Sequence, residues 1–535
     1  DLVGRKVLLP PLGLITVASL LPPTWQLRLV DCNIRDVSDE EWNWAELVLI
    51  SAMLVQKQDL ARLIEQANRR LLPVAVGGPF VSSTPDAAEL RHAQYLILDE
   101  GEITIPLWLQ ALERGEASGR YSADGVHPDV SLSPIPRFDL LERQAYNMMP
   151  VQFSRGCPFQ CEFCDIIVLY GRKPRTKSSV QLLNELDHLL ALGWRGEIFL
   201  VDDNFIGNKR NVKLLLTELE RWQHDHGFPF GFTTEASVDL ASDPDLMESM
   251  VRSGFRRVFL GIETPDEGSL RLTNKLQNTR TPLEQSVDAI TDHGLQVMAG
   301  FILGFDGEKS GAGDRIVAFV NRTGIPLAML GILLALPNTA LWHRLEREGR
   351  LLASDDQFDQ GVQTHLLNFV PDRPMEEIAA EFLQAFSDLY APIPYAQRVY
   401  RYVCKLAQGR RRYAHGQKAP RPWRQSAGLM RGLVILCWRQ GVLRCTRSLF
   451  WTQLVGIIIH HPQILDEYLW LLMLNEHFLD YQLTVRQQVE QQLVLWQHLK
   501  AAMGVCRLDS PMVLQEPRHA QSKPVQQHNE IVSSL

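Results

Sequence analysis

The chain has 535 residues, of which 45% are hydrophobic and 22% are charged, a composition typical of a soluble globular protein with several domains. Its net charge of -8 gives no general reason to expect a nucleic-acid partner. We recognise no signal peptide and no uninterrupted apolar run of about 18 residues, so we expect a cytoplasmic protein without a spanning helix. Because Asp1 is followed almost directly by an apolar strand, we also expect an N-terminally shortened fragment.

Residues 1–120 alternate short apolar runs with helical patterns. Strands are expected over 27–30, 47–50, 74–76 and 95–98, and each ends in polar or small turn residues. Continuous apolar strands separated by helices indicate a parallel, doubly wound sheet, so we predict an α/β domain with a Rossmann-like fold. Ligands of such sheets bind beyond the carboxyl ends of the strands.

Residues 121–148 are rich in Pro, Ser, Asp and Gly and predict a linker. Residues 149–340 alternate strands and helices more regularly. Six strands are expected, over 151–154, 197–202, 230–235, 256–263, 296–303 and 328–335. Six β/α units predict a partial TIM-like (β/α)6 barrel with its active site at the carboxyl ends of the strands. An open α/β sheet is the alternative, because the spacing is compatible with both.

Residues 341–505 have long helical periodicities and predict a mostly helical domain, followed by a disordered tail over 506–535. No Asp or Glu occurs from Leu389 to Leu465, whereas 13 Lys and Arg do. Three of these cations are Lys418, Arg421 and Arg424. We expect the basic region 398–447 to contact an anionic membrane surface, or to pack on the barrel as a helical cap with solvated arginines. The two interpretations are compatible.

Three of the eight cysteines, Cys157, Cys161 and Cys164, stand in a Cys-x3-Cys-x2-Cys pattern. Thiolates favour iron–sulfur clusters, zinc or copper(I). An electron-transfer cluster and a structural zinc site each take four ligands, and the next cysteine is Cys404. Three thiolates on a four-iron cluster leave one iron open for a small molecule. We identify the spacing as the signature of radical S-adenosylmethionine (SAM) enzymes and predict an oxygen-sensitive [4Fe–4S] cluster, with a zinc site as the alternative.

Residues near the ends of the barrel strands are candidates for binding SAM. They include an aromatic residue directly before the third cysteine, two aspartates that suit the SAM ammonium, two glutamates at strand ends that are either functional or structural, and a glycine that lets backbone approach the adenine. They are Phe163, Asp202, Asp203, Glu235, Glu263 and Gly304. A helix N-cap is the alternative for the two aspartates. Four cations over 172–177 either face an anionic group of a ligand or form a solvated loop.

The whole chain resembles the cobalamin-binding radical SAM proteins, especially the subgroup that contains the hopanoid C-2 methylases. The matching segments include 10–14, 50–53, 77–79, 154–165 and 261–265. The resemblance implies that cobalamin binds over the strand ends of the first domain. The implied contacts are Ser51, Ala52, Gly77, Gly78 and Pro79, small residues that let the cofactor lie against backbone. Asp99 departs from the glycine usual in the family, and a domain that has lost its cofactor is the alternative.

The resemblance also implies a function, a cobalamin-dependent C-methyltransferase that acts on an unactivated carbon of an apolar, lipid-like substrate. Such an enzyme needs an external electron donor. No individual catalytic residue is assigned by the sequence. The alternatives are a non-methylating radical SAM oxidoreductase or cyclase, a degenerate cluster-binding protein without turnover, and a nucleic-acid modifier that uses the basic tail.

Overall fold

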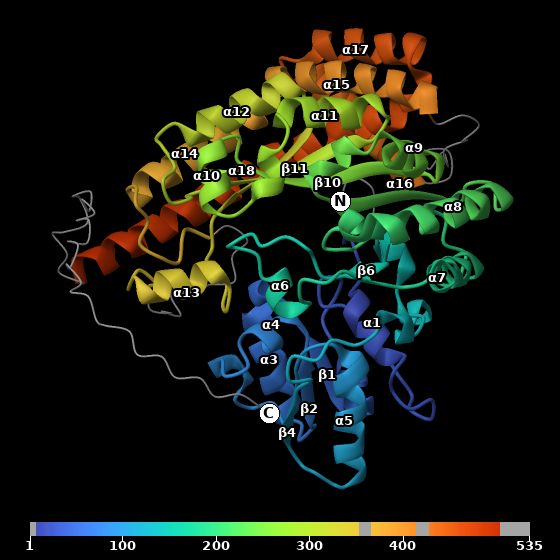
Figure 1. Cartoon of the computed structure of the whole chain (residues 1–535), viewed down its shortest axis with the longest axis vertical. Coiled ribbons are helices and arrows are strands. Elements are labelled where there is room, and N and C mark those ends of the chain that lie inside the picture. Colours follow the sequence, from blue (N-terminus) through green and yellow to red (C-terminus); the bar gives the residue numbers. More distant parts are fainter. Residues whose placement is uncertain (1–6, 353–364, 414–426, 503–535) are drawn as a thin grey trace, which may run out of the picture.

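The computed structural model describes residues 7–352, 365–413 and 427–502. Figure 1 shows the N-terminal part of the chain at the bottom, the middle part above it, and the C-terminal helices across the top. The tail over 506–535, expected to be disordered, lies outside the described residues, as do Lys418, Arg421 and Arg424.

Four parallel strands form the N-terminal sheet, in the order β1-β2-β3-β4. They are β1 (Val48–Ser51), β2 (Val74–Gly77), β3 (Tyr95–Ile97) and β4 (Gly119–Tyr121), flanked by α1 (Leu12–Ala18), α2 (Asp39–Trp44), α3 (Lys57–Asn68), α4 (Pro79–Ser83) and α5 (Gly101–Glu113). Strand β2 is buried on both faces. Val74 and Val76 pack in one core cluster with Leu60 of α3, while Ala75 packs in another with Trp108 of α5. The Rossmann-like prediction is confirmed.

One expected strand is wrong. Residues 27–30 pair with no strand, although Leu27 packs against the small core around Trp108 and Leu29 packs against the large barrel core. Their apolar pattern therefore reflects burial and not pairing. Conversely, β4 was not expected, because Gly119, Arg120 and Tyr121 contain no apolar run. The domain boundaries at residues 120 and 148 stay predictions.

The middle of the chain forms a six-stranded parallel sheet in the order β12-β11-β10-β9-β8-β5. Its strands are β5 (Met148–Val151), β8 (Gly196–Leu200), β9 (Phe230–Ala236), β10 (Phe255–Glu263), β11 (Gln296–Leu303) and β12 (Leu327–Ile332). The helices that follow them are α7 (Ser179–Ala191), α8 (Lys209–Asp225), α9 (Pro244–Arg252), α10 (Glu267–Leu272), α11 (Leu283–Asp292) and α12 (Ala312–Thr323). The sheet stays open between β5 and β12, which confirms a partial barrel.

Three short elements frame the cysteines and lie apart from the large sheet. They are the antiparallel pair β6 (Ser154–Arg155) and β7 (Arg175–Thr176), and the helix α6 (Ile166–Leu169). Helix α13 (Ala340–Arg347) follows the barrel, and the Leu341 N–H donates to the Glu162 carbonyl within the cysteine loop at 2.9 Å.

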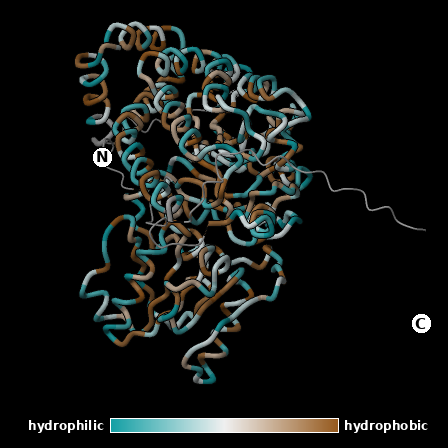
Figure 2. Tube along the Cα trace, turned by 90° about the vertical axis from the view of Figure 1, so that its left-hand side faces the viewer, coloured by the Kyte–Doolittle hydropathy of each residue, from teal (hydrophilic) through white to brown (hydrophobic). Residues whose placement is uncertain are grey.

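The C-terminal region is helical, as predicted. It contains α14 (Met375–Leu389), α15 (Pro392–Tyr413), α16 (Ala427–Trp438), α17 (Arg447–His460) and α18 (Leu465–Ala502). Figure 2 shows hydrophobic and hydrophilic positions alternating along the helices, the pattern of elements with one face in a core. One hydrophobic core runs from Val258 of β10 through Tyr402 of α15 to Leu471 of α18, so the helices share the barrel core. Within the described residues no helix combines the length and apolarity needed to cross a membrane.

Several cations of the basic region hold this helical cap in place. Arg398 is completely buried and donates to the Leu389 carbonyl and to Asn321. Arg410 pairs with the buried Glu467, and Arg444 pairs with the buried Glu476 at 2.7 Å. Much of the positive charge between residues 398 and 447 is therefore engaged with the protein itself.

Candidate active site

The three cysteines lie on one loop that begins at β6 and leads into α6. Gly156 opens this loop with φ +90°, and a Cβ there would lie only 2.9 Å from the Gly171 carbonyl oxygen. A residue with a side chain would therefore be strained and obstructed at this turn. The Cys157 N–H donates to the same Gly171 carbonyl at 3.3 Å, which fixes the position of the first cysteine.

All three cysteines are free thiols in a largely buried setting. Burial raises the pKa of Cys157, and it raises the pKa of Cys164 to about 12. These thiols hold their protons tightly, so metal binding must release them. Gln277 donates to the Cys161 Sγ at 3.5 Å, and the Asn204 Nδ2 lies 4.0 Å from the Cys157 Sγ. Amide donors of this kind stabilise charge on cluster-bound sulfur.

The donor set fits an iron–sulfur cluster by its chemistry, three thiols on one loop with amide donors beside them. No three His, Cys, Asp or Glu side chains among the described residues are gathered around a single metal-ion position. Thiolates of a four-iron cluster bind separate irons and need not converge on one point.

Asp202 and Asp203 follow β8 and hold the beginning of the cysteine loop. The completely buried Asp202 carboxylate accepts hydrogen bonds from the Phe153 N–H at 2.7 Å, the Ser154 N–H at 2.8 Å and the Ser154 Oγ at 2.6 Å. Asp203 accepts from the Gly156 N–H at 3.0 Å. Burial raises the pKa of Asp202 to about 7 and that of Asp203 to about 6. Both aspartates thus position the motif, and their contact with SAM stays a prediction.

Glu235 and Glu263 end the neighbouring strands β9 and β10. Burial, together with the nearby Asp203 and Glu263 carboxylates, raises the pKa of Glu235 to about 7. Glu263 has φ +63°, an uncommon conformation for a side chain of this kind, and accepts a hydrogen bond from the Lys275 Nζ at 2.5 Å. The Lys275 ammonium already offsets the charge of Glu263. A further ammonium near Glu235 would favour its ionised form, and contact of either glutamate with SAM stays a prediction.

Phe163 of the cysteine loop lies against Phe305, and Gly304 stands directly between Phe305 and the end of β11. The Phe163 and Phe305 ring centroids are 5.7 Å apart, and the Lys275 Nζ is 5.7 Å from the Phe163 centroid. Gly304 has φ +97°, and its N–H donates to the Glu308 carboxylate at 3.0 Å. Sequence reasoning missed Lys275 and Gln277, because both belong to a short 3-10 helical turn after α10 that no motif marks.

A cavity of about 610 Å³ lies between the N-terminal sheet and the barrel, within the size range of small-molecule sites. One wall consists of the strand ends of the first domain and includes all five residues predicted to contact cobalamin: Ser51, Ala52, Gly77, Gly78 and Pro79. The other wall comes from the cysteine-bearing domain and includes Gln152, Arg155, Leu169, Tyr170, Val201 and Asp203. The carboxyl edges of the two parallel sheets therefore face each other across one cavity.

Gly78 shapes the wall of this cavity. It has φ +94°, and a Cβ would meet the Ser51 Oγ at 2.5 Å. Glycine therefore lets β1 and the turn after β2 approach each other closely. The departure at Asp99 is accommodated, because its carboxylate accepts hydrogen bonds from the Ser122 hydroxyl and the Ala123 N–H, both at 2.8 Å.

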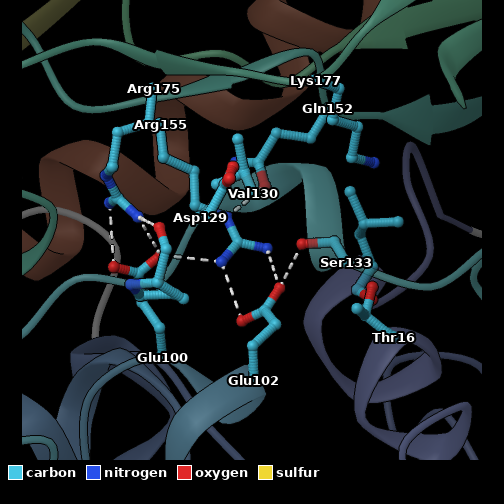
Figure 3. Close-up of polar contacts among 12 residues, drawn as sticks. Thr16, Glu100, Glu102, Asp129, Val130, Ser133, Gln152, Arg155, Arg175 and Lys177 are labelled. Carbon is cyan, nitrogen blue, oxygen red and sulfur yellow. Dashed lines mark hydrogen bonds and ion pairs between the residues drawn. The ribbon is translucent and has the colours of Figure 1, made fainter.

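A buried ionic cluster joins the two domains beside the cavity (Figure 3). Arg155, two residues before Cys157, donates to Glu102 at 2.8 and 2.9 Å and to Glu100 at 2.7 Å. Arg175 donates to Glu100 at 2.8 Å. Figure 3 shows both glutamates rising from the start of α5 towards the arginines. The cysteine motif is thus tied directly to the first domain, a role that sequence reasoning did not assign to these residues.

The basic segment over 172–177 is accordingly not a solvated loop as a whole. Arg175 belongs to the ionic cluster, and Lys177 forms a buried ion pair with Glu185 of α7. Each of these two cations therefore already has a carboxylate partner within the protein.

Comparison with known proteins defines first the class and then the family. The model of the radical SAM superfamily matches residues 151–319, and a domain of unknown function matches residues 339–491. An uncharacterized methyltransferase of Synechocystis sp. is 57% identical over 493 residues, which cover 92% of this chain and 90% of that protein. The hopanoid C-2 methylase of Rhodopseudomonas palustris is 34% identical over 463 residues, covering 83% and 82% of the two chains. The chain belongs to this family of radical SAM methyltransferases and is an enzyme.

A solved structure shares the fold of nearly the whole chain. The cobalamin-dependent SAM radical enzyme OxsB, with aqua-cobalamin and SAM bound, superposes with a TM-score of 0.57 at 14% identity, covering 91% of this chain and 82% of that one. Radical SAM enzymes use a [4Fe–4S] cluster and SAM, so both are cofactors of this chain.

Proposed function

We propose that the enzyme is a cobalamin-dependent C-methyltransferase that acts on an unactivated carbon of an apolar, lipid-like substrate. The single observation that carries the proposal is the cavity between the carboxyl edges of the two sheets. The cluster and SAM supply hydrogen abstraction, and cobalamin supplies the methyl group. Both must reach one substrate carbon, and a shared cavity beside the cysteine loop suits that requirement.

Cobalamin fits the residues of the first domain in two respects. Gly77 and Gly78 have no side chain, so a broad, flat ligand can lie against their backbone. Ser51 and Ala52 add only small side chains at the neighbouring strand end. The opposite wall, with Tyr170 and Leu169, covers the ligand from the side of the cysteines and limits access of water.

Support for an apolar substrate comes from the family, since one relative is a hopanoid C-2 methylase. A substrate held in a bilayer would also require peripheral contact of the enzyme with the membrane, for which the basic region 398–447 is the expected place. An external electron donor is part of the same proposal, because the described residues include no second cysteine motif.

Anaerobic reconstitution tests the proposal. Purified protein is loaded with iron, sulfide and cobalamin, then given SAM, dithionite and a membrane-lipid extract, and assayed for 5′-deoxyadenosine and for methylated lipid. The matched variants are Cys157→Ala/Cys161→Ala/Cys164→Ala, which removes the motif, and Cys445→Ala, which removes an exposed cysteine outside it. We expect the first variant to lose cluster iron, 5′-deoxyadenosine and methylation, and the second to keep all three.

The outcomes separate the alternatives. Deoxyadenosine without methyl transfer, from protein that retains cobalamin, would favour the oxidoreductase or cyclase. A full cluster without deoxyadenosine would favour the degenerate protein. Failure to retain cobalamin, with the cluster intact, would overturn the assignment of the cavity.

A further inference from the structure

Eight exposed apolar side chains lie on three consecutive elements, α16, the π-helical turn Arg439–Leu443 and α17, and we refer to them as the apolar patch. It consists of Val434, Trp438, Val442, Leu443, Trp451, Val455, Ile458 and Ile459, whose exposed fractions range from 45% to 65%. Within each helix the members recur every three or four residues, so each helix presents one stripe to solvent. Large exposed apolar side chains gathered in this way mark an interaction surface.

Trp451 of α17 packs on the π-helical turn that follows α16. The Trp451 indole N–H donates to the Gly441 carbonyl at 2.9 Å, and a Cβ at Gly441 would lie 2.9 Å from the Trp451 ring. The indole is thus packed on one edge, yet it remains 45% exposed. Tryptophan held in this way is suited to a boundary between water and hydrocarbon.

Each stripe begins at an arginine. Arg431 lies three residues before Val434, and Arg447 lies four residues before Trp451, so both cations extend the apolar stripes. Both are exposed, and neither forms an ion pair with a carboxylate among the described residues. They differ in this from Arg410 and Arg444, which pair with buried glutamates. Within the part of the chain that the structure describes, the patch is therefore bordered by two exposed cations without a carboxylate partner.

We propose that this patch lies on an anionic bilayer, with its apolar side chains at headgroup depth and the two arginines on lipid phosphates. A second copy of the chain fits the patch less well than a bilayer does. In a two-fold dimer the same surface would face itself, so the arginines of one copy would lie close to the arginines of the other and repel them. A bilayer supplies the apolar interior and the negative charge together. The proposal places the contact on α16 and α17, partly beyond region 398–447, and it holds whatever reaction the enzyme performs.

Vesicle co-sedimentation of the full chain tests it, at low and high salt, with vesicles of phosphatidylcholine alone or mixed with phosphatidylglycerol. Val455→Asn/Ile459→Asn removes exposed apolar side chains of the patch, and Arg431→Gln/Arg447→Gln removes the cations. The matched control is Leu214→Asn/Leu272→Asn, which changes two equally exposed apolar residues on barrel helices. Thermal unfolding of each variant checks that the fold is kept.

We expect binding to the mixed vesicles at low salt, weakened by high salt. The apolar double variant should bind about tenfold or more weakly, since two side chains no longer leave water on binding. The arginine variant should lose the preference for anionic vesicles, and the control should bind like the parent chain. Absence of binding at low salt, or equal loss in the control, would overturn the proposal. So would a dimer in solution that Val455→Asn/Ile459→Asn dissociates, since a second copy would then occupy the patch.

Discussion

Arg155 and Glu102 form a bidentate ion pair that crosses the interface between the two α/β domains, with N–O distances of 2.8 and 2.9 Å. The exposed fractions of the two side chains are 12% and 7%. Arg155 stands two residues before the first cysteine, and Glu102 stands in the first turn of α5 beside the cavity. The position of the cysteine loop relative to the first domain therefore depends on a planar cation that can bond two carboxylates at once.

Replacing Arg155 with Ala should destabilise the protein strongly. The change removes the cation that pairs with the buried Glu102 and one of the two arginines that pair with Glu100, and we expect a loss of about 3 kcal/mol in the free energy of unfolding. Urea unfolding of the cluster-free protein measures it. Arg137→Ala breaks an exposed pair with Asp139 and should cost less than about 1 kcal/mol. Equal unfolding midpoints for the two variants would contradict the structural role of Arg155.

The same pair should make stability depend on acidity. Burial alone would raise the pKa of Glu102, but Arg155 more than compensates and lowers it to about 2, from an ordinary value of 4.5. A carboxyl whose pKa is lower in the folded protein than in the unfolded chain stabilises the fold. This stabilisation is complete above the pKa of the unfolded chain and is lost as the pH falls towards the pKa of the folded protein. We therefore expect roughly 3 kcal/mol to be lost between about pH 5 and pH 2.

Urea unfolding across this pH range, with Glu102→Gln as the variant, measures the contribution. The variant should show a flatter dependence on pH. Glu267→Gln, at an exposed carboxylate paired with Arg271 within α10, is the control and should follow the parent curve. A Glu102→Gln curve that runs parallel to the parent would show that the carboxyl does not titrate as expected.

Gly78→Ala should weaken cobalamin retention. Alanine there combines the strain of φ +94° with a Cβ at 2.5 Å from the Ser51 Oγ, and the wall of the cavity must move. Gly115→Ala is a matched control, because Gly115 has φ +79° and nothing lies within 4 Å of its Cβ position. Both variants should lose about 1 kcal/mol in the free energy of unfolding, because alanine is strained at a positive φ. Only Gly78→Ala should bind cobalamin about tenfold or more weakly in equilibrium dialysis, and equal affinities would contradict the assignment of this wall.

Gln277→Leu should make the cluster harder to reduce. The amide that donates to the Cys161 Sγ at 3.5 Å favours the more negative, reduced state, so its loss should lower the reduction potential. A redox titration of the reconstituted cluster followed by electron paramagnetic resonance measures the shift. Gln181→Leu alters an amide that bonds backbone carbonyls of Val130 and Ser133, away from the thiols, and should leave the potential unchanged.

The amino-acid sequence determined the class of protein and most of its secondary structure. Apolar periodicity is local, so the strands near 74–76 and 256–263 were predicted within a residue or so of their positions. The cysteine spacing is equally local, because the three ligands of the cluster share a single loop. Where an apolar run reflected burial without pairing, as at 27–30, the same reasoning failed.

Only the tertiary structure decided which side chains meet around that loop. Arg155 and Glu102 are 53 residues apart in the sequence, and Gln277 and Cys161 are 116 residues apart. Such contacts depend on how two sheets pack edge to edge, and no local periodicity encodes that packing. The cavity between the strand ends arises for the same reason, since each domain supplies one wall and neither wall by itself encloses a site.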